Sequence, residues 1–179
     1  MSVHAFVDES RRNDTYYLAA AIVQPGDLKR LRSGLRGLLF PEQRELHFFK
    51  EKPARRRLLL SSVADSGARV DIYRTNCRRS EERARQDCLA RLTDDLLDVE
   101  GHRLVFDSRQ ERDLFDMRTI RHVPAKRPGE SPLVYEDVTS VSEPLLWPAD
   151  IGAWCHGAGG DWARRAAPLM GSVVRLDWP

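Results

Sequence analysis

The chain has 179 residues, of which 41% are hydrophobic and 31% are charged, and its formal net charge is +2. These values predict one domain over residues 1–179 with enough apolar side chains for a core. No run reaches the roughly 20 apolar residues that cross a bilayer, and the N-terminal residues lack the features of a signal peptide. Three widely spaced cysteines argue against a disulfide framework or a structural zinc site. We therefore expect a cytoplasmic protein that does not contact a membrane.

Apolar runs and breakers alternate along the chain in the order expected of a mixed α/β fold. Residues 3–7 and 15–23 predict two strands of an antiparallel hairpin, joined by a polar turn over 8–14. Leucine spacing predicts a first helix over 28–39. The remaining predicted elements are an extended segment over 45–49, a helix over 53–63, a strand over 69–74, a helix over 80–99, a strand over 103–107, a helix over 108–121, a loop over 123–131, a strand over 133–138, a helix over 148–156 and a strand over 173–176.

Four carboxylates stand at the ends of apolar runs that are far apart in the sequence. Asp8 follows the first predicted strand, Asp107 ends a later strand, Glu45 opens the extended segment, and Asp150 lies in the first turns of the last main helix. A carboxylate beside a buried element costs desolvation free energy unless something positive pairs with it. Each residue alone is explained equally well as a turn former or a helix cap. Together they predict a shared cation site.

The chemistry of such a site follows from its oxygen ligands. Mg²⁺ and Mn²⁺ prefer carboxylate oxygens and keep several waters for substrate phosphates. Two such ions about 4 Å apart activate a water and stabilise the leaving oxygen of a phosphodiester. The predicted metal ligands are Asp8, Glu45, Asp107 and Asp150. His47, which shares a face with Glu45 in an extended segment, is a candidate proton shuttle or an ordinary surface histidine.

Positive charge is almost all arginine, and the arginines are clustered. Because a guanidinium binds phosphate through two parallel hydrogen bonds, the arginines over 53–57 and 118–127 are candidates for nucleic-acid backbone contacts. Lys50 is a candidate for stabilising phosphate charge at the rim of the site, or part of a solvated basic patch. A GC-rich genome produces the same arginine bias, so the clusters alone do not identify a nucleic-acid binder.

The ordered set of motifs resembles the domain-of-unknown-function family 3800, which is regarded as having a ribonuclease-H-like fold. The resemblance covers residues 3–154 and implies an α/β fold with a central mixed sheet that opens with an antiparallel hairpin and carries helices on both faces. It also implies a divalent metal-dependent nuclease. The motifs that match the family pattern, in order, are Phe6-Val7-Asp8-Glu9-Ser10 followed by an apolar strand, Glu45 with Lys50, Asp107, and Leu146-Trp147-Pro148-Ala149-Asp150-Ile151.

Two departures from that family pattern keep a second hypothesis open. Arg11 stands where the family usually has glycine, and Trp147-Pro148 replaces a glutamine-leucine step before Asp150. Our first hypothesis is a magnesium- or manganese-dependent nuclease, with RNA or an RNA/DNA hybrid preferred by fold analogy alone. The alternative is a non-catalytic module that binds nucleic acid or a protein through the same fold with a degraded metal site. A third hypothesis is a hydrolase of nucleotides or small phosphate esters.

Overall fold

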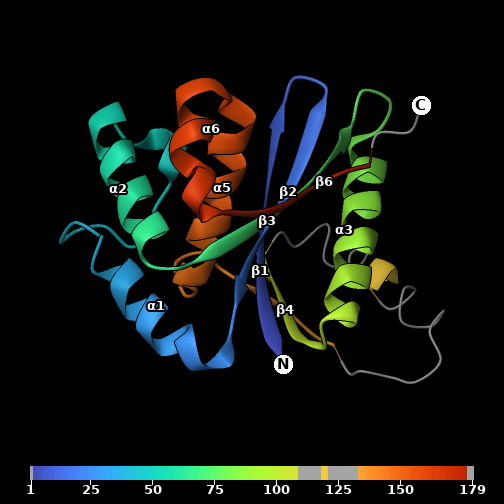
Figure 1. Cartoon of the computed structure of the whole chain (residues 1–179), viewed down its shortest axis with the longest axis horizontal. Coiled ribbons are helices and arrows are strands. Elements are labelled where there is room, and N and C mark those ends of the chain that lie inside the picture. Colours follow the sequence, from blue (N-terminus) through green and yellow to red (C-terminus); the bar gives the residue numbers. More distant parts are fainter. Residues whose placement is uncertain (1, 109–117, 121–132, 177–179) are drawn as a thin grey trace.

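The computed structural model describes residues 2–108, 118–120 and 133–176, and its six strands form one mixed sheet (Figure 1). The sheet order is β5-β4-β1-β2-β3-β6. Strands β1 to β3 form an antiparallel meander, β4 and β5 add in parallel beside β1, and β6 adds in parallel beside β3. The strands are β1 (Val3–Arg12), β2 (Thr15–Val23), β3 (Arg69–Asn76), β4 (Gly101–Asp107), β5 (Val134–Val138) and β6 (Met170–Arg175).

Helices cover both faces of this sheet, as predicted (Figure 1). Alternate residues of a strand point to opposite faces, so Ala5 and Val7 pack in the core beneath α3 (Glu81–Asp98), whereas Phe6 packs in the core beneath α5 (Trp147–Ala158). The α5 face also carries α1 (Leu28–Arg36), α2 (Pro53–Asp65) and α6 (Gly160–Ala166). Single 3-10 turns form at Pro25–Asp27, Phe48–Lys50, Pro144–Leu146 and Ala167–Leu169.

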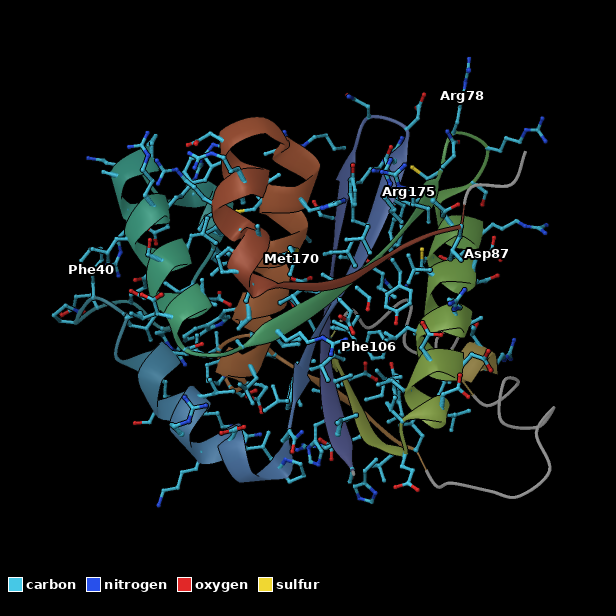
Figure 2. All side chains as sticks on the ribbon, in the orientation of Figure 1. Phe40, Arg78, Asp87, Phe106, Met170 and Arg175 are labelled. Carbon is cyan, nitrogen blue, oxygen red and sulfur yellow. The ribbon has the colours of Figure 1, made fainter. Side chains whose placement is uncertain are left out.

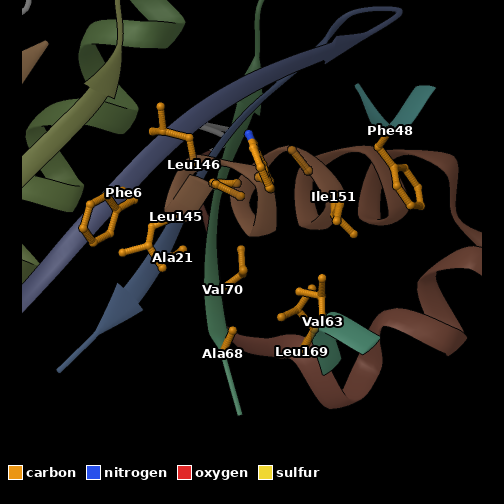
Figure 3. Packing of buried hydrophobic residues seen from close by; sticks show 14 of the residues in the cluster. Phe6, Ala21, Phe48, Val63, Ala68, Val70, Leu145, Leu146, Ile151 and Leu169 are labelled. Atoms are coloured by element: carbon orange, nitrogen blue, oxygen red, sulfur yellow. The ribbon is translucent and has the colours of Figure 1, made fainter. Parts of the chain in front are cut away.

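Helix α5 lies directly on the sheet and fixes the position of Asp150. Ile151 and Leu146 from this region of the chain are buried among Val70 of β3 and other apolar side chains (Figure 3). A Cβ atom added at Gly152 would lie 2.8 Å from Val70 Cγ1, so only glycine permits this close approach of α5 to β3. The first turn of α5 is therefore held against the strands.

Two predicted segments are wrong. The structure does not end the first strand before Asp8: pairing with β2 continues to Arg12 opposite Thr15, and the turn contains only Asn13, at φ 53°, and Asp14. The polar residues that signalled a turn are instead the exposed end of a long hairpin. The segment over 45–49, predicted as extended, ends in the 3-10 turn at Phe48–Lys50.

The remaining predictions concern the segment over 108–131, the cysteines and membrane-spanning helices. Most of the helix predicted over 108–121 and the whole loop over 123–131 lie outside them. The three cysteines are free and buried. Within the described part of the chain, no helix is both long and apolar enough to cross a bilayer.

Candidate functional site

Asp8 and Asp107 lie side by side on adjacent parallel strands, as the sequence predicted. The register of β1 and β4 pairs the residues immediately before them, Val7 and Phe106, so the two aspartates occupy the next pair of positions. Neighbouring strands are about 5 Å apart. Both side chains belong to the α5 face, because each stands two residues after a strand residue of the core beneath α5. Two carboxylates from distant parts of the sequence thus lie next to each other.

Asp150 approaches the same place from the first turn of α5, where the helix dipole favours a negative charge. Its Oδ2 accepts a hydrogen bond from the backbone N–H of Phe48 at 3.2 Å. Burial raises the pKa of Asp150 to about 6, and the neighbouring charge of Asp107 adds to the rise, whereas the Phe48 N–H and the ring of His47 oppose it. Asp150 and Asp107 are therefore close enough to repel each other when both are ionised.

These three aspartates line one pocket of about 450 Å³, which we call the acid pocket. It is the place where β1, β4 and the first turn of α5 meet the segment that precedes α2. Its full lining is Asp8, Glu9, Ser10, Arg11, Arg12, Leu46, His47, Phe49, Asp107, Ser140, Leu146, Trp147, Asp150 and Trp154. The acid pocket is large enough to admit a phosphodiester group with bound ions and waters.

Glu45 is not among the residues that line the acid pocket, but it contacts two that do. Its Oε1 lies 2.9 Å from His47 Nε2, and its Oε2 accepts a hydrogen bond from the hydroxyl of Ser140. Both partners line the pocket, and Ser140 is itself fixed because its carbonyl oxygen accepts a hydrogen bond from Trp147 Nε1 at 2.9 Å. Glu45 therefore orients His47 and Ser140 at the pocket wall.

Lys50 also does not line the acid pocket. It is exposed, and its ammonium lies 5.9 Å from the ring centroid of Phe49, which is a lining residue. Lys50 is thus on the outer rim, one side chain away from the space that a substrate phosphate would occupy.

Sequence reasoning missed two side chains of the acid pocket, Arg12 and Trp154. The Arg12 guanidinium lies 5.5 Å from the Trp154 ring, and that of Arg56 lies 4.6 Å from the same ring. Had β1 been extended past Asp8, the strand period of two would have placed Arg12 on the same face as Asp8. No sequence pattern marked Trp154, because a tryptophan in an apolar helix is usually interpreted as a core residue.

Glu9 is held on the opposite face of β1 from Asp8. Its side chain is 8% exposed and forms an ion pair with Arg85 of α3, which is 4% exposed. The Tyr16 hydroxyl donates a second hydrogen bond to Glu9. Glu9 therefore belongs to a buried polar cluster that joins the hairpin to α3.

A metal would have to bind the acid pocket through few protein ligands. Within the described residues, no three His, Cys, Asp or Glu side chains are grouped closely enough to hold one ion. Mg²⁺ is usually held by only one or two carboxylates plus water and substrate phosphate oxygens. The adjacent Asp8 and Asp107 fit this mode, and Asp150 is near enough to contact a second ion or its waters.

The raised pKa of Asp150 predicts that Asp150→Asn stabilises the metal-free protein at high pH. Below about pH 3 the carboxyl is protonated in both the folded and the unfolded chain, so it contributes no difference, and at pH 4 the difference is already small. Above about pH 6 the folded protein must hold the ionised form, which costs at most about 3 kcal/mol and less where water screens it. Asparagine removes this cost and keeps an oxygen to accept the Phe48 N–H.

Thermal melts in EDTA at pH 4 and pH 8 test this expectation. The melting temperature of Asp150→Asn should exceed that of the wild type at pH 8 and approach it at pH 4. Asp65→Asn, at an exposed carboxylate, is the matched control and should change neither value. A variant that is equally or less stable than the wild type at pH 8 would show that Asp150 is not electrostatically strained.

The comparisons with known proteins bear on the fold. No family model matches the sequence, and no curated protein is significantly similar to it. The chain is similar to RNase HII as solved in the PCNA:RNase HII complex from Archaeoglobus fulgidus, with a TM-score of 0.56 and 16% identity over 88% of this chain and 72% of that chain. At this identity the similarity concerns the fold alone, which is consistent with a ribonuclease-H-like α/β architecture.

Proposed function

We propose that this chain is a divalent metal-dependent nuclease that hydrolyses phosphodiester bonds in the acid pocket. The observation that carries the proposal is the meeting of Asp8, Asp107 and Asp150, from three separate elements, at one pocket. The similarity to RNase HII, by its name a ribonuclease, supports the same class of activity. Like charges are brought together at a free-energy cost, and a bound cation offsets that cost.

In this proposal Mg²⁺ or Mn²⁺ is held mainly by Asp8 and Asp107, with Asp150 completing the negative wall. When bound, such ions activate a water and stabilise the leaving oxygen. His47 lines the pocket, where it would accept or return a proton, and Glu45 holds the imidazole through Nε2. We assign Glu45 to this orienting role, because its carboxylate oxygens already accept hydrogen bonds from His47 and Ser140.

The substrate of the proposed enzyme is nucleic acid. RNA or an RNA/DNA hybrid is preferred by analogy to the fold of RNase HII. Lys50 and the arginines over 55–57 would contact backbone phosphates at the rim, and the predicted contacts over 118–127 fall largely outside the described residues. The ordered carboxylate motifs also support the proposal that the chain is a member of the domain-of-unknown-function family 3800.

A manganese titration of the thermal melt tests metal binding apart from catalysis. At a manganese concentration 100 times the dissociation constant, binding adds about 2.7 kcal/mol of stability, or roughly 5 to 10 °C for a domain of this size. The Asp8→Asn/Asp107→Asn double variant should melt at a temperature that manganese does not change. Equal shifts in both proteins would place the bound ion outside the acid pocket.

The non-catalytic alternative is favoured by one observation: within the described residues, no three potential ligands form a ready-made group for one ion. A binding module with a degraded site would melt at the same temperature with and without millimolar manganese. Such a module would still bind an oligonucleotide in EDTA, so the melt and the binding measurement together separate the two functions.

A further inference from the structure

A second and larger pocket, of about 720 Å³, opens at the end of the sheet where β3 passes into α3. Four arginines line it: Arg74 from the end of β3, Arg78 and Arg79 from the connection, and Arg83 from the first turns of α3. We call it the arginine pocket. Its other lining residues are Thr15, Thr75, Asn76, Ser80, Ala84 and Asp87.

Positive charge in the arginine pocket is poorly compensated. Among the described residues, Asp87 is the one carboxylate on its lining, and it lies 4.0 Å from Arg83, at the outer limit of an ion pair. Arg78 and Arg79 are exposed and form no ion pair with the described residues. Arg78 reaches into solvent and Arg175 of β6 lies at the same end of the molecule (Figure 2). Several guanidinium groups thus surround one pocket, where an anion would neutralise them.

A row of neighbouring side chains on the α5 side, with the buried Tyr17 in its middle, links the acid pocket to the arginine pocket. It begins with Arg12 and Trp154, which line the acid pocket. Tyr17 comes next: a Cβ atom at Gly157 would lie 3.3 Å from its ring and 3.5 Å from Arg12 Nε. Arg74, which lines the arginine pocket, lies 5.6 Å from the Tyr17 ring.

Two arginines of this row pack against aromatic rings: Arg12 against Trp154 and Arg74 against Tyr17. A guanidinium that rests on an aromatic face keeps its N–H edges available for phosphate oxygens while losing little further side-chain entropy. His156 packs edge-on against Tyr17, with ring centroids 5.7 Å apart. Burial lowers the pKa of His156, and the positive charges of Arg74 and Arg175 lower it further. The imidazole is therefore neutral at pH 7 and adds a flat polar surface beside two cations.

The distance between the two pockets is comparable to the length of several nucleotides of a nucleic-acid strand. Arg12 is four residues beyond Asp8 along β1, which is about 13 Å at the rise of a strand. The end of β3 lies two strand spacings, or about 10 Å, to the side of Arg12. The straight-line separation between Asp8 and the end of β3 is then about 16 Å, which a single strand spans with several nucleotides.

We propose that the arginine pocket binds the backbone phosphates of a single nucleic-acid strand several nucleotides away from the bond held in the acid pocket. This proposal rests on the nuclease function above for the position of that bond. Between the two pockets the strand would pass Arg12 and Arg74, and the buried ring of Tyr17 packs against Arg74. The arginine pocket would supply affinity and direction without reading base sequence, because guanidinium–phosphate contacts carry no sequence information.

The test measures binding in EDTA, where no cleavage occurs, by fluorescence anisotropy of labelled single-stranded RNA of 3 and 12 nucleotides. We expect Arg78→Ala/Arg79→Ala to weaken binding of the 12-mer by about tenfold. The slope of log affinity against log salt should fall by about 1.4, since each single-strand phosphate contact contributes about 0.7. Lys29→Ala/Arg30→Ala, at the far end of the molecule on α1, removes the same charge and is the matched control (Figure 1).

Cleavage separates this proposal from the proposed function. With manganese, the Arg78→Ala/Arg79→Ala variant should raise KM for the 12-mer and leave the rate on the 3-mer unchanged. Equal losses in the arginine variant and the α1 control would reduce the effect to net charge and overturn the proposal. Unchanged 12-mer affinity would overturn it as well. Absence of manganese-dependent cleavage in the wild type, with the binding difference intact, would instead contradict the nuclease function alone.

Discussion

Asp8→Asn should abolish manganese-dependent cleavage, with a loss of at least about a thousandfold in kcat/KM. Asp8 stands beside Asp107 on the adjacent strand, and the pair is the best-placed oxygen donor set of the acid pocket. Removing one carboxylate removes a metal ligand, and bound metal contributes several kcal/mol to stabilising the transition state. The measurement is cleavage of a labelled oligonucleotide by purified wild-type and variant protein.

The same variant should be as stable as the wild type in EDTA, or more stable. Asparagine keeps the side-chain oxygen that accepts the Glu9 N–H at 2.7 Å, and it relieves repulsion by Asp107. Equal or raised melting temperature with lost activity identifies a ligand, whereas lowered stability would identify a structural role. Asp65→Asn controls for the loss of one charge and should cleave like the wild type. Full activity in Asp8→Asn would remove the basis of the site assignment.

Arg85→Met should destabilise the protein by about 3 to 5 kcal/mol, the largest stability loss that we expect from a substitution outside the core. Arg85 and Glu9 form a buried ion pair, 4% and 8% exposed, and Arg85 Nη1 also lies 3.3 Å from the Tyr16 hydroxyl. Removing one partner leaves an uncompensated charge in the interior. At 2 to 4 °C for each kcal/mol, the melting temperature should fall by about 10 °C.

A double variant distinguishes the lost charge balance from lost packing. Glu9→Gln/Arg85→Met removes both charges and should recover most of the stability, because replacing a whole buried pair is often nearly neutral. The manganese-induced rise in melting temperature should persist in both variants, since the Glu9 carboxylate is paired with Arg85 and Tyr16 and is not one of the proposed metal ligands. If the double variant is no more stable than Arg85→Met, the loss comes from packing of the guanidinium.

Local patterns were enough to predict the parts of the fold that obey a simple period. Helix α3 was predicted over 80–99, and in the structure Ser80 caps it, because its hydroxyl accepts the Arg83 N–H at 3.2 Å. The hairpin and β4 followed from short apolar runs. The convergence of Asp8 and Asp107 followed as well, because two strands that end in acid and lie in one sheet present those acids at neighbouring positions.

Contacts between distant segments could not be predicted from local sequence patterns. Glu45 is predicted as a metal ligand, and its contacts with His47 and with Ser140, which is 95 positions away, could not be foreseen. The continuation of β1 to Arg12 depends on pairing with Thr15, which outweighs the low strand propensity of Glu9–Arg12. The arginine pocket likewise exists only because the β3–α3 connection gathers arginines that looked like a compositional bias.

Anomalous diffraction from a manganese-soaked crystal tests the central claim most directly. We expect at least one anomalous peak in the acid pocket, at a ligand distance of about 2.1 Å from carboxylate oxygens of Asp8 and Asp107. An acid pocket without a peak at millimolar manganese, or manganese bound only by other residues, would contradict the account.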